Sequence, residues 1–541
     1  MAEAKEADRL PDHVDHYESS DQGDFNENEA PGDSHEKILI ASDSYEDLNY
    51  DDIAVSSFGK PYSGSIIDIV RHNSCSDEKE ADASSLNLIN ESSAESSNED
   101  QNEGQVKDLS ADKVPEDVGE GMKLEIRENE DFGPEWRQKK KHLFIFSSAG
   151  KPIYSRHGSE DKLVTIMGVM QALVSFVQVS GDNMRCIIAG DHKFIFLNRD
   201  QIVLVGVSSA GDSSTQIVLQ LSYVYNQIIS VLTYTSLHKI FKQRRNYDLR
   251  RLLSGAEKFI DNLVNMMDTE PGFLLGAIRC LPLDAPVREM IEQTIVLNAK
   301  VKDLVFAVML ANNQLISLVR MKKYFLSAMD LHLIINLVNA SESFKTAESW
   351  TPICLPKFDS SGFLQAHISY LDENSQTCLL LLSVDREAFF TLSECKNKIQ
   401  ERLLKYNSLR AISDSLATTS YSIQQCGITD LRHFLYKSKS IAQYTSPELE
   451  APYLTPADQE RLFGLYHYLH HRIHSPARPL KILYYVGEQE TLLGWMTQGF
   501  ELYTVFGPLV TKTNAIHAIN KLLRWIKKEE DQLFILNSVT F

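Results

Sequence analysis

Hydrophobic positions along the chain predict the same order of secondary-structure elements three times between residues 136 and 541. Each repeat opens with two strand-like apolar runs around a turn, as at residues 142–148 and 152–156. An amphipathic helix, three further strand-like runs and a second amphipathic helix follow, with apolar residues at helical spacing in both helices. The pattern therefore predicts one α/β module of about 100 residues that is repeated three times.

Polar residues mark the position where the first helix of each module begins. Ser159 precedes two acidic residues, and Ser327 is followed by Asp330 three positions on. Thr455 precedes Pro456, and proline is favoured at the first helical position. Each of the three hydroxyl residues predicts a helix N-cap, because its oxygen can accept a hydrogen bond from a backbone N–H that has no partner within the helix.

Segments of different composition precede and separate the modules. The linker between the first two modules is expected to be helical up to Asp268 and broken at Pro271, with Pro282 and Pro286 marking irregular backbone. The predicted segments are a tail at 1–135, a first module at 136–235, a helical linker at 236–302, a second module at 303–408 and a third module at 428–541.

The tail carries the negative charge of the chain. Residues 1–135 contain 37 acidic and 10 basic side chains, and the remaining residues contain 37 acidic and 44 basic ones. Because the tail is also poor in apolar residues, it cannot bury enough surface to offset the entropy of ordering, and we expect it to be disordered. The mildly basic remainder is compatible with anionic membrane surfaces as partners. We expect no nucleic-acid partner.

The sequence indicates a cytosolic protein. Its first residues lack the basic and apolar regions of a signal peptide. The most apolar run, residues 304–319, is interrupted by Asn312 and Asn313, and a membrane helix needs about 20 apolar residues. Seven cysteines form no C-x-x-C pair, which favours reduced thiols over a disulfide framework.

No catalytic signature is found along the chain. Gly150 and Lys151 do not form a phosphate-binding loop, because Pro152 follows where that motif needs Ser or Thr. Nucleophile elbows, dinucleotide-binding turns and metalloprotease helices do not occur either. We therefore expect a protein that is not an enzyme and that needs no cofactor.

Four histidines in the first helix of the third module have the spacing of metal ligands. His467, His470, His471 and His474 recur at intervals of three and four residues, which brings several of them near one helix face. No acidic residue lies among them, and apolar neighbours take the buried stripe. We therefore expect these histidines to face solvent, and we predict no metal site.

Two basic clusters are candidate lipid-binding sites, one in the linker and one before the first module. Anionic head groups attract basic side chains near the membrane surface, and each such residue contributes roughly 1 kcal/mol to binding. The alternative for both clusters is a solvated helix face. The candidate residues are Lys139, Lys140, Lys141, Lys239, Lys242, Arg244, Arg245, Arg250 and Arg251.

The segment 348–358 combines a tryptophan with two prolines at the start of a strand. Such a stiff, apolar loop fits two interpretations. Trp350 either packs over the edge of its own sheet or anchors a partner protein, since tryptophan is enriched at binding hot spots. The sequence leaves both open.

Several stretches resemble a known family. The order of elements matches the longin module, and residues 144–158 and 167–176 closely resemble the first module of the SAND family of vacuolar fusion proteins, the Mon subunits. Residues 349–358 look like the second-module signature of that family. The resemblance extends over residues 136–541 and implies three longin modules, each a five-stranded antiparallel sheet with flanking helices.

The resemblance also implies a function on endosomal and lysosomal membranes. Members of this family pair with a Ccz subunit, and the pair is a guanine-nucleotide exchange factor for the late-endosomal and lysosomal Rab GTPase. An early-endosomal Rab and phosphatidylinositol 3-phosphate recruit the pair, and animal members bind a third, regulatory subunit. Exchange of this kind needs no catalytic side chain, because the factor holds the GTPase in a state with low nucleotide affinity.

In that family the first modules of both subunits form the GTPase platform, and the later modules hold the pair together. The helix at 159–178 is therefore our candidate for the GTPase-facing element. It carries more apolar side chains than one sheet face needs, including Met170 and Phe176. A tether or coat subunit without exchange activity is the alternative. The contact candidates for the GTPase or the partner are Met167, Met170, Phe176, Trp350, Ile353 and Leu355.

Overall fold

The computed structural model describes residues 45–48, 134–244, 247–372, 374, 376–418 and 421–541. The disorder expected for the tail therefore concerns residues that lie almost entirely outside the described ones. Within the tail, the described parts are β1 (Tyr45–Leu48) and the start of α3 (Pro134–Gln138).

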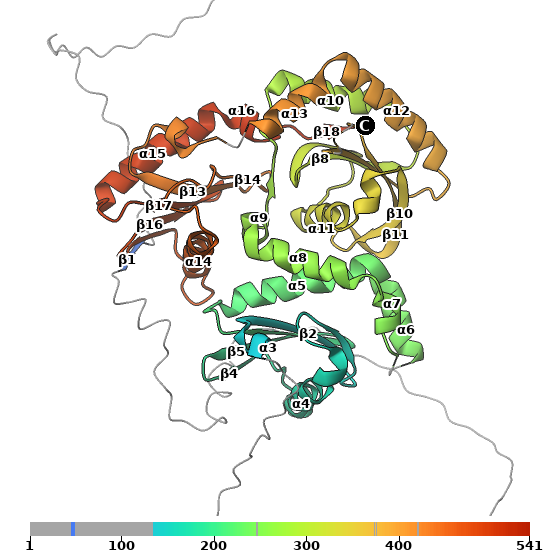
Figure 1. Cartoon of the computed structure of the whole chain (residues 1–541), viewed down its shortest axis with the longest axis vertical. Coiled ribbons are helices and arrows are strands. Elements are labelled where there is room, and N and C mark those ends of the chain that lie inside the picture. Colours follow the sequence, from blue (N-terminus) through green and yellow to red (C-terminus); the bar gives the residue numbers. More distant parts are fainter. Residues whose placement is uncertain (1–44, 49–133, 245–246, 373, 375, 419–420) are drawn as a thin grey trace, which may run out of the picture. The chain divides into compact units, whose positions relative to one another are not determined.

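The predicted order of elements is present three times (Figure 1). Module 1 consists of β2 (Lys141–Ser147), β3 (Pro152–Ser155), α4 (Glu160–Val179), β4 (Cys186–Ala189), β5 (His192–Arg199), β6 (Ile202–Ser208) and α5 (Ser214–Leu232). Module 2 consists of β8 (Leu304–Ala311), β9 (Gln314–Arg320), α11 (Ala328–Asn339), β10 (Ser349–Leu355), β11 (Asp359–Tyr370), β12 (Thr377–Ser383) and α12 (Phe389–Lys405). Module 3 consists of β13 (Leu431–Ser438), β14 (Gln443–Thr445), α14 (Pro456–Ile473), β15 (Ile482–Val486), β16 (Thr491–Met496), β17 (Phe500–Phe506) and α15 (Lys512–Lys528). The prediction of three α/β modules is confirmed.

All three sheets share one topology. Module 1 has the strand order β4-β5-β6-β2-β3. Read from the same edge, modules 2 and 3 repeat this order as β10-β11-β12-β8-β9 and β15-β16-β17-β13-β14. Neighbouring strands within a module are antiparallel. Strands from outside the modules extend two of the sheets in parallel: β18 (Val539–Thr540) on β9, β7 (Ile278–Arg279) on β14 and β1 on β15. The linker and the chain end thus become parts of neighbouring sheets.

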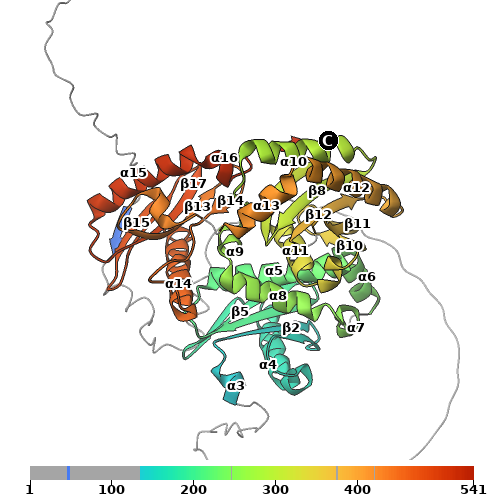
Figure 2. The ribbon, with the colours of Figure 1, turned by 45° about the horizontal axis from the view of Figure 1, so that its top comes forward.

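The sheet of module 1 separates two helices. Phe144 and Phe146 on β2 pack under α4, whereas Ile145 between them belongs to the core under α5. One strand serves both layers because consecutive side chains point to opposite faces. The α5 side continues through α8 (Glu257–Thr269) into the core of module 2, and α4 covers the other face (Figure 2).

The linker differs from its prediction at two prolines. Its helices are α6 (Tyr234–Gln243), α7 (Arg250–Leu253), α8, α9 (Pro271–Leu275) and α10 (Ala285–Asn298). Pro271 separates α8 from α9, as expected, but it also begins the second of these helices. Pro286 lies in the first turn of α10, so irregular backbone was the wrong prediction there. Proline fits this turn because the N–H groups there have no partner within the helix.

The helix starts follow the predicted pattern, with one difference. The side chain of Ser327 accepts a hydrogen bond from the N–H of Asp330 at 3.1 Å, and Thr455 accepts one from the N–H of Asp458 at 3.2 Å. Ser159 occupies the N-cap of α4, but its side chain makes no capping hydrogen bond. Further short helices are α13 (Ser408–Ala417), α16 (Glu530–Leu533) at the end of module 3, and two 3-10 turns, Glu342–Lys345 and Ile423–Cys426.

A buried guanidinium joins three segments of the chain. Arg288 on α10 is 5% exposed. Its Nη1 donates to the carbonyl of Ile316 at 2.8 Å, and its Nη2 donates to the carbonyls of Leu281 at 2.9 Å and Gln532 at 3.0 Å. These carbonyls belong to β9, to the linker and to α16. One side chain therefore connects module 2, the linker and the end of module 3.

We expect Arg288→Ala to lower the free energy of unfolding by at least about 3 kcal/mol, because three buried carbonyls lose a charged donor. Urea unfolding of the full chain, followed by circular dichroism, measures the change. Arg251→Ala is the matched control, since Arg251 is an exposed arginine on α7 and should change stability by less than about 0.5 kcal/mol. Equal stability of the two variants would contradict the role of Arg288.

Candidate docking surface

Helix α4 has a buried face and an exposed apolar face on opposite sides. The buried face packs against the sheet through Leu163, Met167, Met170 and Val174. The exposed face consists of Val169, Leu173, Phe176 and Val179, with exposed fractions of 56%, 41%, 75% and 89%. We call these four residues the α4 stripe. Their spacing places them on one side of the helix, opposite the sheet.

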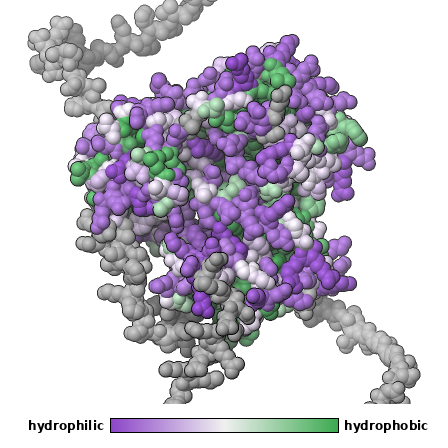
Figure 3. Space-filling model, in the orientation of Figure 1, coloured by the Kyte–Doolittle hydropathy of each residue, from purple (hydrophilic) through white to green (hydrophobic). Residues whose placement is uncertain are grey.

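The apolar excess of α4 is unusual for a surface helix. By length and composition alone, α4 is apolar enough to cross a membrane, but one face of it forms a layer of module 1. In the view of Figure 3, most of the surface is hydrophilic and the apolar residues form separate patches. Several large apolar side chains in a row on one exposed helix face are typical of an interaction site.

Strand β4 forms an open edge of the same module. It pairs with β5 on one side, and no described strand pairs with its other side. The side chain of Ile188 on this strand is 73% exposed. The strand at the opposite edge, β3, contacts the linker instead, because the hydroxyl of Tyr154 on β3 donates to Asp261 of α8. Because an open edge presents unpaired N–H and C=O groups, β4 can accept a strand from another chain.

The structure places four of the six contact candidates in the core. Met167 and Met170 belong to the buried face of α4, and Ile353 and Leu355 are buried in module 2. Our expectation that Met170 adds exposed apolar surface was therefore wrong, since the α4 stripe supplies it instead. Helical periodicity alone could have found the stripe, because its members lie opposite the buried methionines. Phe176 stays a contact candidate.

Trp350 is partly buried and packs over its own module. Its Nε1 donates to the carbonyl of Arg386 at 3.2 Å, and its ring lies edge-on to Phe389 with a centroid distance of 6.0 Å. Module 2 therefore occupies much of the indole surface. Of the two interpretations that the sequence left open, these contacts support packing over the sheet edge.

The lipid candidates before module 1 have different surroundings. Lys139 is exposed. Lys140 is exposed and lies 3.4 Å from Glu460. Lys141 lies 3.3 Å from the carboxylates of both Asp212 and Asp268. Lys141 therefore links module 1 to α8 and is not available to a lipid.

The linker cluster remains largely accessible. Arg250 is engaged with the carboxylates of Asp248 and Asp161, both at 3.2 Å. Arg245 lies outside the described residues. The exposed members are Lys239, Lys242, Arg244 and Arg251. Exposed basic side chains on and next to α6 and on α7 thus remain accessible.

The four histidines of α14 form two pairs on two faces. His467 and His471 face module 1, where they contact Gln216 and Thr215 at the start of α5. Burial lowers the pKa of His467 to about 4, so its ring is neutral at physiological pH. His470 and His474 face the sheet of module 3 instead. Our expectation that these histidines face solvent was wrong, because both sides of α14 are covered.

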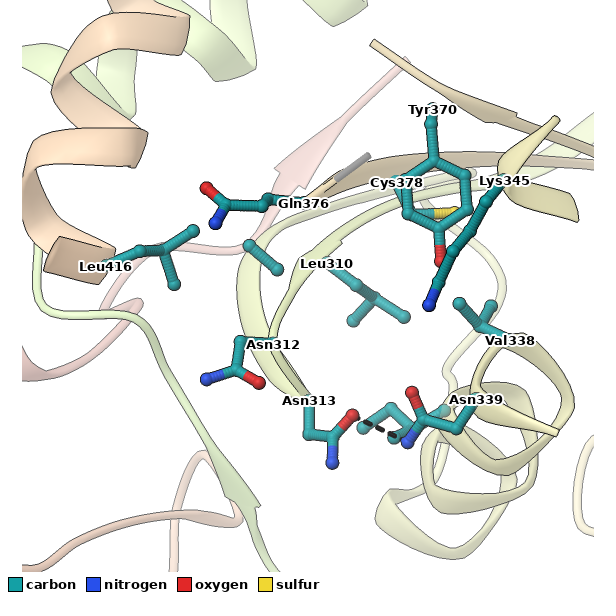
Figure 4. A pocket seen from close by; sticks show the side chains of 12 residues that line it. Leu310, Asn312, Asn313, Val338, Asn339, Lys345, Tyr370, Gln376, Cys378 and Leu416 are labelled. Carbon is teal, nitrogen blue, oxygen red and sulfur yellow. Dashed lines mark hydrogen bonds between the residues drawn. The ribbon is translucent and has the colours of Figure 1, made fainter. Parts of the chain in front are cut away.

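A pocket of about 330 Å³ lies at the β8–β9 turn of module 2 (Figure 4). Asn339 donates to Asn313 at 2.6 Å at its rim. Burial raises the pKa of the Cys378 thiol far above its usual range, so that this thiol is not a nucleophile. The remaining polar lining consists of Asn312, Lys345, Tyr370 and Gln376. This set can hold a small polar molecule but places no base beside a nucleophile.

Comparison with known proteins identifies the family. Models described as the first, second and third longin domains of FUZ, MON1 and HPS1 match residues 141–263, 302–401 and 430–530. The vacuolar fusion protein MON1 homolog A of Gallus gallus is 52% identical over 419 residues, which cover 77% of this chain and 76% of the relative. The chain belongs to the MON1 family.

Other members of the MON1 family match a comparable share of the chain. The protein SAND of Takifugu rubripes is 51% identical over 413 residues, covering 76% of this chain and 79% of the relative. The MON1 homolog B of Homo sapiens is 44% identical over 421 residues, covering 74% and 76%. The resemblance to the SAND family and its longin modules is confirmed.

Two substitutions on α4 should separate its faces. Phe176→Ala should change the free energy of unfolding by less than about 0.5 kcal/mol, because the ring is exposed. Met170→Ala should cost roughly 2–5 kcal/mol, because it leaves a cavity between α4 and the sheet. Urea unfolding of both variants measures the two changes in the free energy of unfolding. A large loss with Phe176→Ala would mean that the ring packs within the chain and is not free for a partner.

Proposed function

We propose that this chain is one subunit of a heteromeric guanine-nucleotide exchange factor that activates the late-endosomal and lysosomal Rab GTPase. The observation that carries the proposal is the α4 stripe together with the open β4 edge, both on module 1. Its relatives are named vacuolar fusion proteins, which agrees with a role in late-endosome conversion and fusion. Exchange by this route is differential binding to two states of the GTPase and requires no catalytic side chain.

The two features suit two different partners. Strand addition at β4 would fix a Ccz-type longin subunit by main-chain hydrogen bonds, which set the orientation of the pair. The α4 stripe then presents apolar side chains to the GTPase from a rigid helix. An edge strand by itself offers little specificity, so the exposed side chain of Ile188 would help to select the partner.

Recruitment completes the proposal. An early-endosomal Rab, phosphatidylinositol 3-phosphate and a third regulatory subunit would bring the pair to endosomal and lysosomal membranes, where it is peripheral. The support within this chain is the linker cluster, whose exposed members are Lys239, Lys242, Arg244 and Arg251. Anionic head groups would be attracted to these side chains.

Nucleotide release tests the exchange function. We expect fast release of a fluorescent guanine nucleotide from the late-endosomal Rab when this chain and its Ccz-type partner are both present, and little release with either alone. Phe176→Asp combined with Val169→Asp should slow release by at least about tenfold, because a loss of about 1.4 kcal/mol of binding already gives that factor. Phe325→Asp is the matched control, since Phe325 is 70% exposed but lies in module 2.

The outcomes distinguish the functions. Full activity of this chain alone would refute the shared platform. If the pair forms but releases no nucleotide, the tether or coat alternative is favoured. Equal slowing by the control variant would show that the α4 stripe is not the relevant surface.

Liposome sedimentation tests the linker cluster. Reversing Lys239, Lys242 and Arg244 to Glu should weaken binding to vesicles that contain phosphatidylinositol 3-phosphate, and added salt should weaken binding of the unaltered chain, since exposed charges are screened within about 8 Å at physiological ionic strength. The matched control reverses three exposed basic residues of α12 and α13: Lys398, Lys405 and Arg410. If both triple variants bind equally, the cluster is a solvated helix face.

A further inference from the structure

Two histidines and a glutamate converge between α14 and the sheet of module 3. His470 lies in the last turn of α14 and His474 is its C-cap residue, four positions on, and Glu501 points toward them from β17. One ligand atom from each of the three side chains lies within 4.8 Å of the other two. The Nε2 of His474 is 3.2 Å from an oxygen of Glu501, and the two imidazole rings are 4.2 Å apart.

The surroundings of these groups suit a cation. The ring of His470 lies between α14 and the sheet, with its centroid 6.1 Å from that of Tyr503. The side chain of Glu501 is 3% exposed, and Lys437 lies 3.3 Å from its carboxylate. Among the described residues, none forms a hydrogen bond with the ring of His470. A partly buried imidazole is thus left without a partner beside a carboxylate.

We propose that His470, His474 and Glu501 bind a divalent transition-metal ion, with Zn²⁺ as the preferred occupant. Two imidazoles and one carboxylate are a common donor set for zinc, with metal–ligand distances of about 2.0–2.2 Å. Such distances place neighbouring ligand atoms about 3.3 Å apart in a tetrahedral site, close to the present separation of His474 and Glu501. A water molecule would complete the coordination.

The surrounding side chains leave one carboxylate oxygen for the metal. Lys437 and Lys439 lie 3.3 and 3.8 Å from the Oε1 atom of Glu501. The histidine and the hydroxyl of Tyr503 approach Oε2 instead, and that hydroxyl donates to it at 3.1 Å. Outer hydrogen bonds of this kind orient a ligating carboxylate. The ion would bind through Oε2, on the side away from the lysines.

Bound metal would act on the junction of modules 1 and 3. It would hold one face of α14 against β17, while His467 and His471 on the other face contact α5. The site concerns the stability of this junction and does not depend on the exchange activity.

The untagged full chain is first freed of metal with a chelator that is then removed. Uptake of Zn²⁺ is measured afterwards by competition with a second, chromophoric chelator. We expect one tightly held equivalent per chain and a rise of several degrees in the melting temperature. His470→Ala and His474→Ala should each weaken binding by more than about 100-fold, since losing even an outer hydrogen-bond partner of a ligand typically costs 10–100-fold. Both variants should lose the thermal shift.

His192→Ala is the control, because His192 is exposed on β5 of module 1, and it should bind like the unaltered chain. His474 is partly exposed, so its variant should keep the fold, which circular dichroism without metal verifies. Failure of the unaltered chain to take up a stoichiometric equivalent would overturn the proposal. Equal affinity of the folded His474→Ala variant would overturn it as well.

Discussion

The buried guanidinium of Arg288 is the constraint on which the arrangement of modules 2 and 3 depends. A buried cation is tolerated only when hydrogen bonds replace its lost hydration. The three carbonyls that do so come from the linker, from β9 and from the end of module 3. They converge only when all three segments are in place. The chain end then continues to β18, which adds a parallel strand to β9. The sheet of module 2 is therefore completed by the last residues of the chain.

This arrangement makes the three modules unequal although their sequences predict the same elements. The α5 side of module 1 is part of a core that continues into module 2, whereas α4 and β4 have no cover among the described residues. A module that is buried on one side only can present its other side without losing its own core. For this reason we propose the first module as the docking surface, and the proposed pairing with a second longin subunit uses groups that the described part of this chain leaves unpaired.

Charged and titratable groups gather where modules meet. Lys141 contacts carboxylates of both module 1 and α8, and His467 contacts α5 from module 3. At such a junction a side chain loses water on both sides, so a polar partner must be supplied by the neighbouring module. Residues that look like a solvated face or a lipid-binding cluster in the sequence therefore become structural contacts. The exposed residues of the linker cluster make no such contacts between modules, because α6 and α7 lie at the surface.

The sequence by itself determined the three modules, their element order, the helix starts at Ser327 and Thr455 and the resemblance to the SAND family. These features depend on local periodicity and on contacts between neighbouring residues, which a linear pattern records. Periodicity separates the two apolar faces of α4, but only the tertiary structure decided which of them packs against the sheet, so that Met170 joined the core and Phe176 stayed a contact candidate. It also supplied the acidic residue that the histidines of α14 lack in the sequence, because Glu501 reaches them from a strand 27 positions beyond His474. Contacts between distant residues depend on how the layers pack, and no local pattern along the chain encodes them.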